Sequence, residues 1–167
     1  MKLLLTSGGV TNASIRQALV AMLGRPIEES TALCIPTAMY GHPWVGPGER
    51  AWQFISGRAE NPMVDLGWKS VGVLGLSAGS MVMTPEVGDD FIQWRPPSGD
   101  DSTLGLVDFS ICPHLVPDGG QGNTMAEAEE WASKIAGPAY VVDDQTAITV
   151  VNGNVEVVSE GHWKQLK

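Results

Sequence analysis

The chain has 167 residues, of which 43% are hydrophobic and 17% are charged. This length and composition predict one globular domain over residues 1–167 and argue against a disordered or membrane-inserted chain. The formal net charge is −9. Nucleic-acid binding needs clustered Lys and Arg, which this sequence lacks, so we expect no nucleic-acid partner.

The apolar residues near the N-terminus and the cysteines indicate the compartment. Leu3, Leu4 and Leu5 form a run that is too short for a signal peptide or a membrane span, so we interpret it as a strand and expect no membrane partner. Cys34 and Cys112 lie in apolar runs, which is typical of reduced, buried thiols. Together these features predict a cytoplasmic protein.

The first part of the chain predicts a strand, a loop and a helix. Residues 1–7 form an apolar strand that ends at Gly8 and Gly9, and Thr11 or Asn12 then caps a helix. The apolar residues of this helix recur at helical spacing: Ile15, Ala18, Leu19, Met22 and Leu23.

The middle of the chain alternates between apolar and turn-rich segments. Residues 32–35 predict a short strand, residues 40–48 a loop rich in turn formers and aromatic residues, and residues 49–59 a helix. Further along, residues 86–101 are acidic and loop-like, and residues 104–112 resemble a strand.

The last part of the chain predicts a helix and a hairpin. Asn123 or Thr124 caps the helix, whose apolar stripe comprises Met125, Ala128, Trp131, Ala132 and Ile135. Two β-rich runs, 147–151 and 155–159, flank an Asn-Gly pair, the strongest short hairpin signal.

The order of these elements predicts the fold class. Strands and helices alternate first, and a hairpin follows, with residues 140–142 as a further strand beside it. This order is typical of an α/β fold with three layers and a mostly parallel sheet, ending in a C-terminal β-hairpin at an antiparallel edge.

Residues 70–85 predict a nucleophile elbow, in which a serine lies on a tight turn between a strand and a short helix. Such a turn is strained, so the residues two before and two after the serine, Gly75 and Gly79, must lack bulk. The N–H group of Ala78 would then point toward an oxyanion formed at Ser77. The alternative is an ordinary glycine-containing turn.

A serine nucleophile needs a base and usually a carboxylate that orients the base. Among the three histidines, His114 is the best candidate because it follows a predicted strand, where α/β sheets place ligand-binding residues. We interpret His162 as a packed or surface residue. The candidate acids lie between Ser77 and His114: Glu86, Asp89, Asp90, Asp101 and Asp108. Each of them could instead be a solvated loop charge.

Several segments resemble the peptidase E family of serine dipeptidases, to which cyanophycinases are related. They are Ser77 to Ser80, Thr84 with Pro85, the segment from Phe109 to His114, and the N-terminal strand that ends in Ser7, Gly8 and Gly9. The spacing from Ser77 to His114 also resembles that of the family.

This resemblance implies a fold similar to class I glutamine amidotransferases and a triad of serine, histidine and an acid. It implies cleavage of dipeptides with an N-terminal aspartate, without a metal or a cofactor. Ser77 matches the nucleophile and His114 the base. Counting along the family pattern places the acid at Ile92, so we assign it to Asp90, with Asp89 or Glu86 as alternatives.

The chain departs from the family pattern in one place. Family members have a further strand, a Gly-Gly-Asn-type loop and a helix before the nucleophile strand, whereas residues 69–74 run directly into Gly75. We therefore expect a shortened member without this source of a second oxyanion donor, a role for which Gly8 and Gly9 are alternatives. The deletion would expose a sheet edge that a second copy could cover, so we expect a homodimer.

Three functions are open on the sequence alone. The first is a serine hydrolase that cleaves short peptides, in which a cation would bind a substrate aspartate. The second is a catalytically impaired homologue that acts as a binding or assembly module. An esterase with an α/β-hydrolase fold is disfavoured because the chain is short and lacks a His-Gly-Gly-Gly-type segment. The candidate cations for the first function are Arg50, Arg58, Lys69 and Arg95.

Overall fold

The computed structural model describes residues 1–30, 75–92, 97, 99–116, 120 and 122–167. The elements predicted at residues 32–35, 40–48, 49–59 and 70–74 lie outside the described residues, as do Cys34 and the four candidate cations.

The first sheet has the strand order β2-β1-β5-β6. Strand β1 (Lys2–Thr6) pairs in parallel with β2 (Gly75–Leu76) and antiparallel with β5 (Thr146–Val151). Strand β6 (Asn154–Ser159) forms the predicted hairpin with β5. The two residues of the hairpin turn, Asn152 and Gly153, have φ values of 52° and 88°, and positive φ at both positions is typical of the favoured turn type.

The second sheet has the order β3-β4-β7. Strand β3 (Ser110–Cys112) is parallel to β4 (Ala139–Val142), and β7 (Trp163–Gln165) runs antiparallel to β4. The described residues therefore form an α/β fold with two mixed sheets. The prediction of three layers around a mostly parallel sheet is not confirmed.

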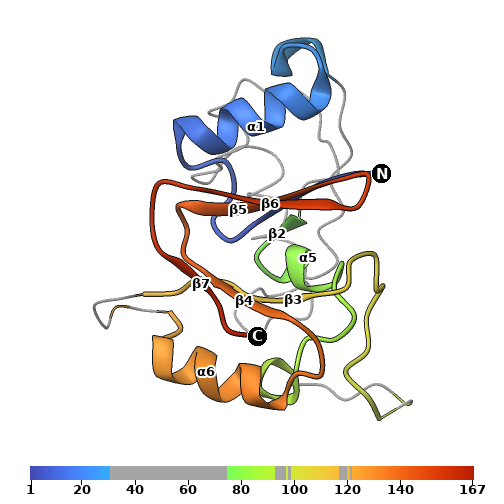
Figure 1. The fold of residues 1–167 in the computed structure, drawn as a ribbon, viewed down its shortest axis with the longest axis vertical. Coiled ribbons are helices and arrows are strands. Elements are labelled where there is room, and N and C mark those ends of the chain that lie inside the picture. The colour runs from blue at the N-terminus through green and yellow to red at the C-terminus, as the bar shows by residue number, and fades with distance from the viewer. Residues whose placement is uncertain (31–74, 93–96, 98, 117–119, 121) are drawn as a thin grey trace, which may run out of the picture.

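Two helices cover the sheets at opposite ends of the molecule (Figure 1). Helix α1 (Ala13–Leu23) contacts β5 and β6, and helix α6 (Met125–Lys134) contacts β4. The shorter elements are α5 (Ala78–Met81) and two 3₁₀ turns, η1 (Ile27–Glu29) and η2 (Asp89–Phe91).

Both long helices begin at caps that the sequence predicts. The side chain of Asn12 accepts a hydrogen bond from the N–H group of Ile15 at 2.9 Å. Thr124 and Glu127 form a reciprocal capping box at the start of α6, and these bonds lower the pKa of the Glu127 carboxyl group below its ordinary value. The caps satisfy N–H groups that have no partner within the helix.

Buried apolar side chains fill three spaces. One cluster joins the two sheets and contains Leu3, Leu5, Val107, Phe109, Ile111, Val142, Ile148 and Val150. A second cluster lies between α1 and the first sheet, and a third between α6 and the second sheet. Burial of apolar surface is the main favourable contribution to folding, so these clusters hold the two sheets and the two long helices together.

The prediction of a strand over residues 104–112 is wrong in its first half. Only Ser110–Cys112 form a strand, while the side chains of Leu104 and Leu106 are 63% and 43% exposed. The N–H groups of Leu104 and Leu106 donate to carbonyl groups of Val82 and Met83, just after α5. The backbone of this segment therefore pairs with the turn after the elbow, and no neighbouring strand is required.

None of the helices in the described part of the chain is both long enough and apolar enough to cross a membrane.

Candidate active site

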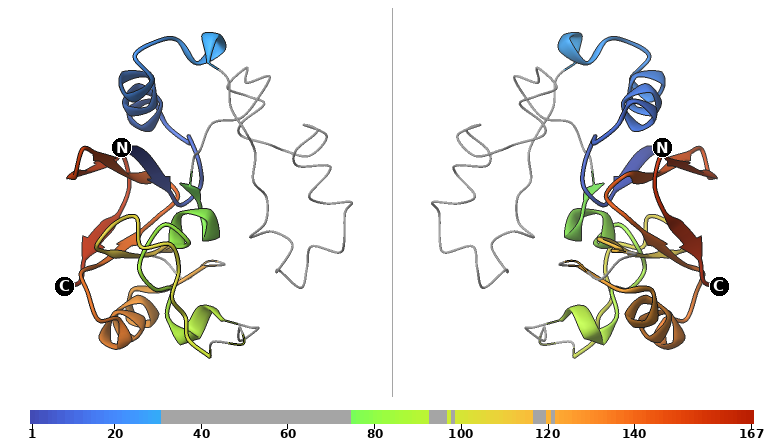
Figure 2. Two further views of the ribbon diagram at one scale, coloured as in Figure 1. Left: turned by 90° about the vertical axis from the view of Figure 1, so that its right-hand side faces the viewer. Right: turned by 90° about the vertical axis from the view of Figure 1, so that its left-hand side faces the viewer.

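Ser77 lies on a strained turn directly after β2. Its φ and ψ are 51° and −119°, a conformation that side chains other than glycine rarely adopt. Its N–H group lies 3.0 Å from the carbonyl oxygen of Thr6 and 3.1 Å from that of Ser7, and donates to both. Helix α5 begins at the next residue and lies between β2 and β3 in both figures (Figures 1 and 2). This geometry is that of a nucleophile elbow.

The two glycines of the elbow differ in how closely the chain approaches them. A Cβ atom at Gly75 would lie 2.9 Å from both Cα and Oγ of Ser80, so a side chain cannot fit there. At Gly79, by contrast, the described residues leave the position of a Cβ atom free within 4 Å. The steric requirement predicted for both glycines therefore holds for Gly75, whereas the described residues impose none at Gly79.

His114 follows β3, and hydrogen bonds of its backbone groups hold it in place. Its φ is 57°, which again lies in the left-handed region that favours glycine. The N–H group of His114 donates to Oγ of Ser7 at 2.8 Å, and its carbonyl oxygen accepts from the N–H group of Asn123 at 2.8 Å. These bonds hold the backbone on both sides of the imidazole ring.

The imidazole ring of His114 bridges a hydroxyl and a carboxylate. Its Nε2 lies 2.6 Å from Oγ of Ser77, and its Nδ1 lies 2.7 Å from Oδ1 of Asp144. A carboxylate accepts hydrogen bonds, so Nδ1 carries the proton that it donates to Asp144. Nε2 is then left to accept the proton of the Ser77 hydroxyl.

Asp144 follows β4 and packs closely against the end of β1. A Cβ atom at Gly8 would lie 2.7 Å from Cβ of Asp144, so only glycine fits this approach. Oγ1 of Thr11 donates to the carbonyl oxygen of Asp144 at 2.6 Å. The loop after β1 thus fixes the position of the carboxylate.

Each of the site residues follows the C-terminal end of a strand. Ser77, His114 and Asp144 come after β2, β3 and β4, and Ser7 comes after β1. Strands β1 and β2 form one parallel pair, and β3 and β4 form the other. The carboxyl ends of parallel strands lie at the same edge of a sheet, which is where α/β proteins bind their ligands.

The structure places Asp90, predicted as the acid, away from His114. Its carboxylate accepts hydrogen bonds from Nζ of Lys134 at 3.0 and 2.9 Å. Among the alternatives, Glu86 accepts from the N–H group of Ala136 at 2.8 Å, and Asp89 belongs to the same 3₁₀ turn as Asp90. The acidic loop after the elbow packs toward α6, and the carboxylate at His114 comes from β4 instead.

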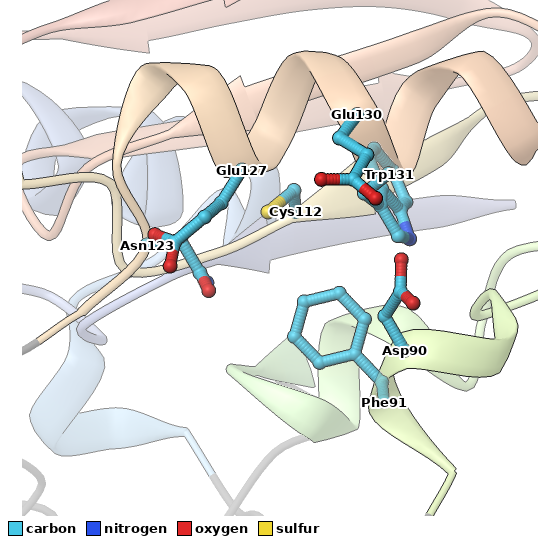
Figure 3. Close-up of a pocket in the computed structure, with 7 residues that line it drawn as sticks. All are labelled: Asp90, Phe91, Cys112, Asn123, Glu127, Glu130 and Trp131. Carbon is cyan, nitrogen blue, oxygen red and sulfur yellow. The ribbon is translucent and has the colours of Figure 1, made fainter.

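Asp90 instead lines a pocket beside α6 (Figure 3). This cavity of about 210 Å³ is lined by Asp90, Phe91, Cys112, Asn123, Glu127, Glu130 and Trp131. Figure 3 shows the Cys112 side chain beneath the helix that carries Glu127 and Trp131. Burial, together with the negative charge of Glu127, raises the pKa of the Cys112 thiol from 9.0 to about 12.

His162 is the histidine that the sequence indicates to be packed or at the surface. Its side chain is 74% exposed, and its Nδ1 lies 3.6 Å from Oδ2 of Asp143. His162 is therefore a surface residue, as the sequence indicates. Within the described part of the chain, no group of three or more His, Cys, Asp or Glu side chains could hold a metal ion.

The sequence contains a signal for Asp144 that the prediction missed. Asp143 and Asp144 directly follow the predicted strand at 140–142, and polar residues at such a strand end are site candidates. The structure separates the two aspartates, because Asp143 accepts from the N–H group of Gln145 at 3.0 Å and from Oγ1 of Thr146 at 2.7 Å. Asp143 therefore stabilises the turn, and Asp144 contacts His114.

The fold and this site define a class: an α/β protein with a serine, a histidine and a carboxylate in one hydrogen-bonded chain. A comparison with family models narrows the class. The model described as peptidase family S51 matches residues 57–158, which is more than half of the chain. The protein therefore belongs to peptidase family S51, and the resemblance to the peptidase E family is confirmed. No curated protein matches the chain.

The state of the Cys112 thiol can be tested by alkylation. Thiolate is the reactive form, and the raised pKa keeps this buried thiol protonated. We expect Cys112 to resist iodoacetamide at pH 8 in the folded protein and to react after unfolding in guanidinium chloride. Peptide mapping separates its signal from that of Cys34. Rapid alkylation of Cys112 in the folded protein would contradict the assignment.

Proposed function

We propose that this member of peptidase family S51 is a serine peptidase that cleaves short peptides through an acyl-enzyme on Ser77. The observation that carries the proposal is the continuous chain of hydrogen bonds from Ser77 through His114 to Asp144. Nε2 of His114 can accept the proton of the Ser77 hydroxyl, and the carboxylate of Asp144 orients the His114 ring.

The first half of the reaction forms the acyl-enzyme. Oγ of Ser77 attacks the carbonyl carbon of the scissile peptide bond while Nε2 of His114 takes the hydroxyl proton. The N–H group of Ala78, the first residue of α5, donates to the negatively charged oxygen of the tetrahedral intermediate. His114 then gives the proton to the leaving amine, and the C–N bond breaks.

The second half regenerates the serine. Water attacks the ester carbon while Nε2 of His114 takes a proton from that water, and the proton then returns to Oγ of Ser77 as the acid product leaves. Asp144 stays ionised and stabilises the positive charge that His114 carries in each half. No redox step or metal-bound water is needed for this hydrolysis.

The substrate class follows from the family resemblance. We propose dipeptides with an N-terminal aspartate as the first substrates to test. Recognition of that aspartate needs a cation, for which Arg or Lys is suited, and the candidates named from the sequence lie outside the described residues.

A second candidate function rests on the departure from the family pattern. A chain without the Gly-Gly-Asn-type loop has one oxyanion donor fewer, and loss of one such donor lowers the rate by about 100- to 1,000-fold. A homologue impaired in this way would act as a binding or assembly module, as a homodimer. Folded wild-type protein that cleaves no member of a broad dipeptide panel would favour this candidate.

Substitution of the nucleophile tests the proposal most simply. We expect Ser77→Ala to lower the cleavage of Asp-Xaa dipeptides by at least about 1,000-fold, because the variant lacks the hydroxyl on which the acyl-enzyme forms. The measurement is the release of free amino acid across a dipeptide panel. Turnover that persists in this variant would exclude Ser77 as the nucleophile.

Two matched substitutions test the carboxylate. Asp144→Asn keeps the shape of the side chain but no longer favours the proton on Nδ1, so we expect kcat to fall about 10⁴-fold. Asp90→Asn removes an exposed ion pair with Lys134, and such pairs contribute at most about 1 kcal/mol to stability. We expect the Asp90 variant to keep the wild-type kcat. The reverse ranking of the two variants would return the acid role to Asp90.

A further inference from the structure

Ser7 contacts all three residues of the proposed triad. It is fully buried and comes directly after β1. Its carbonyl oxygen accepts from the N–H group of Ser77 at 3.1 Å, and its Oγ accepts from the N–H group of His114 at 2.8 Å. The same Oγ lies 2.5 Å from Oδ1 of Asp144.

The Ser7 hydroxyl donates its hydrogen bond to one acceptor, Oδ1 of Asp144. Oγ lies 2.5 Å from Oδ1 of Asp144 and 3.3 Å from Nδ1 of His114. A hydroxyl has a single proton to donate, and Nδ1 already donates its own proton to Asp144. The Ser7 hydroxyl therefore donates to Asp144, and Oδ1 of that carboxylate accepts from two donors at once.

We propose that Ser7 is a positioning residue of the active site, which acts on Ser77 through Asp144 and His114. This inference rests on the proposed function. Hydrogen bonds to a carboxylate are among the stronger ones in proteins, so the Ser7 hydroxyl limits rotation of the Asp144 side chain. Because the same oxygen accepts from the backbone of His114, Ser7 sets the distance between the ring and the carboxylate.

The surroundings of Ser7 make this position rigid. Thr6, the preceding residue, exchanges two hydrogen bonds with Oγ of Ser80 at 3.0 and 2.7 Å. Gly8, the following residue, packs against Asp144 with no space for a side chain. Ser7 therefore cannot shift to follow the carboxylate, and the carboxylate is held relative to β1. A serine with a purely structural role would need only the hydrogen bond with the N–H group of His114, whereas Ser7 also contacts Asp144.

The test compares Ser7→Ala with Ser110→Ala. Ser110 is also buried and lies on the strand that leads to His114, but its hydroxyl donates to the carbonyl oxygen of Glu86 at 3.0 Å, outside the triad. The probe is an alkyl fluorophosphonate, and the measured quantity is the rate at which it phosphonylates the protein. We expect Ser7→Ala to react about 10- to 100-fold more slowly than wild type, because small misplacements of reacting groups are costly. Ser110→Ala should react at the wild-type rate.

Two further readouts separate positioning from a purely structural role. In an Asp144→Asn background, Ser7→Ala should have little additional effect on the rate, because the residue through which it acts is already altered. In ¹H NMR spectra, the Nδ1 proton of His114 should be observed in wild type and in Ser110→Ala, and be lost to exchange with water in Ser7→Ala. Backbone amide spectra check that each variant is folded.

The outcomes distinguish this inference from the proposed function. A wild-type protein that is not phosphonylated at all would overturn the proposed function. A reactive wild type with Ser7→Ala as fast as Ser110→Ala, or with additive effects of Ser7→Ala and Asp144→Asn, would overturn the role of Ser7 alone.

Discussion

The hydrogen bond from Nδ1 of His114 to Asp144 is the interaction on which the rest of the site depends. It decides which nitrogen of the ring carries the proton, and therefore whether Nε2 can accept from Ser77. Strands β3 and β4 are parallel neighbours, so the residues two positions beyond each strand, His114 and Asp144, lie at one edge of the sheet. The strand pairing thus places a carboxylate beside an imidazole ring that lies 30 residues away in the sequence.

Strand β1 has two roles at the site: it pairs in parallel with β2, and it leads into the loop that contacts His114 and Asp144. Strand β1 pairs with β2 through the backbone, and the two residues that follow it, Ser7 and Gly8, contact His114 and Asp144. The two halves of the site therefore come from different sheets, with Ser77 from the first and the His114–Asp144 pair from the second. The loop after β1 joins them, and the cluster of buried side chains between the sheets holds this arrangement in place.

Local signals predicted a large part of this structure. The hairpin at Asn152 and Gly153, the caps at Asn12 and Thr124, and the strained turn at Ser77 depend on short segments whose steric and hydrogen-bonding preferences are visible in the sequence. The carboxylate beside His114 is placed by strand pairing between distant segments, and no local preference encodes that pairing. The expectation that the acid lies between Ser77 and His114 in the sequence favoured Asp90, whereas the carboxylate that contacts His114, Asp144, follows the histidine. The two adjacent aspartates after β4 have different environments, because Asp143 is buried in the turn and Asp144 lies at the surface beside His114.

We infer that the fold activates the hydroxyl of one serine, Ser77. The most direct measurement is peptide mapping by mass spectrometry after treatment with an alkyl fluorophosphonate, in native buffer and in denaturant. We expect a single adduct on Ser77 in native buffer and none in denaturant, because the hydroxyl is reactive only when His114 accepts its proton. An adduct on another serine, or none in the folded protein, would show that the fold does not activate Ser77.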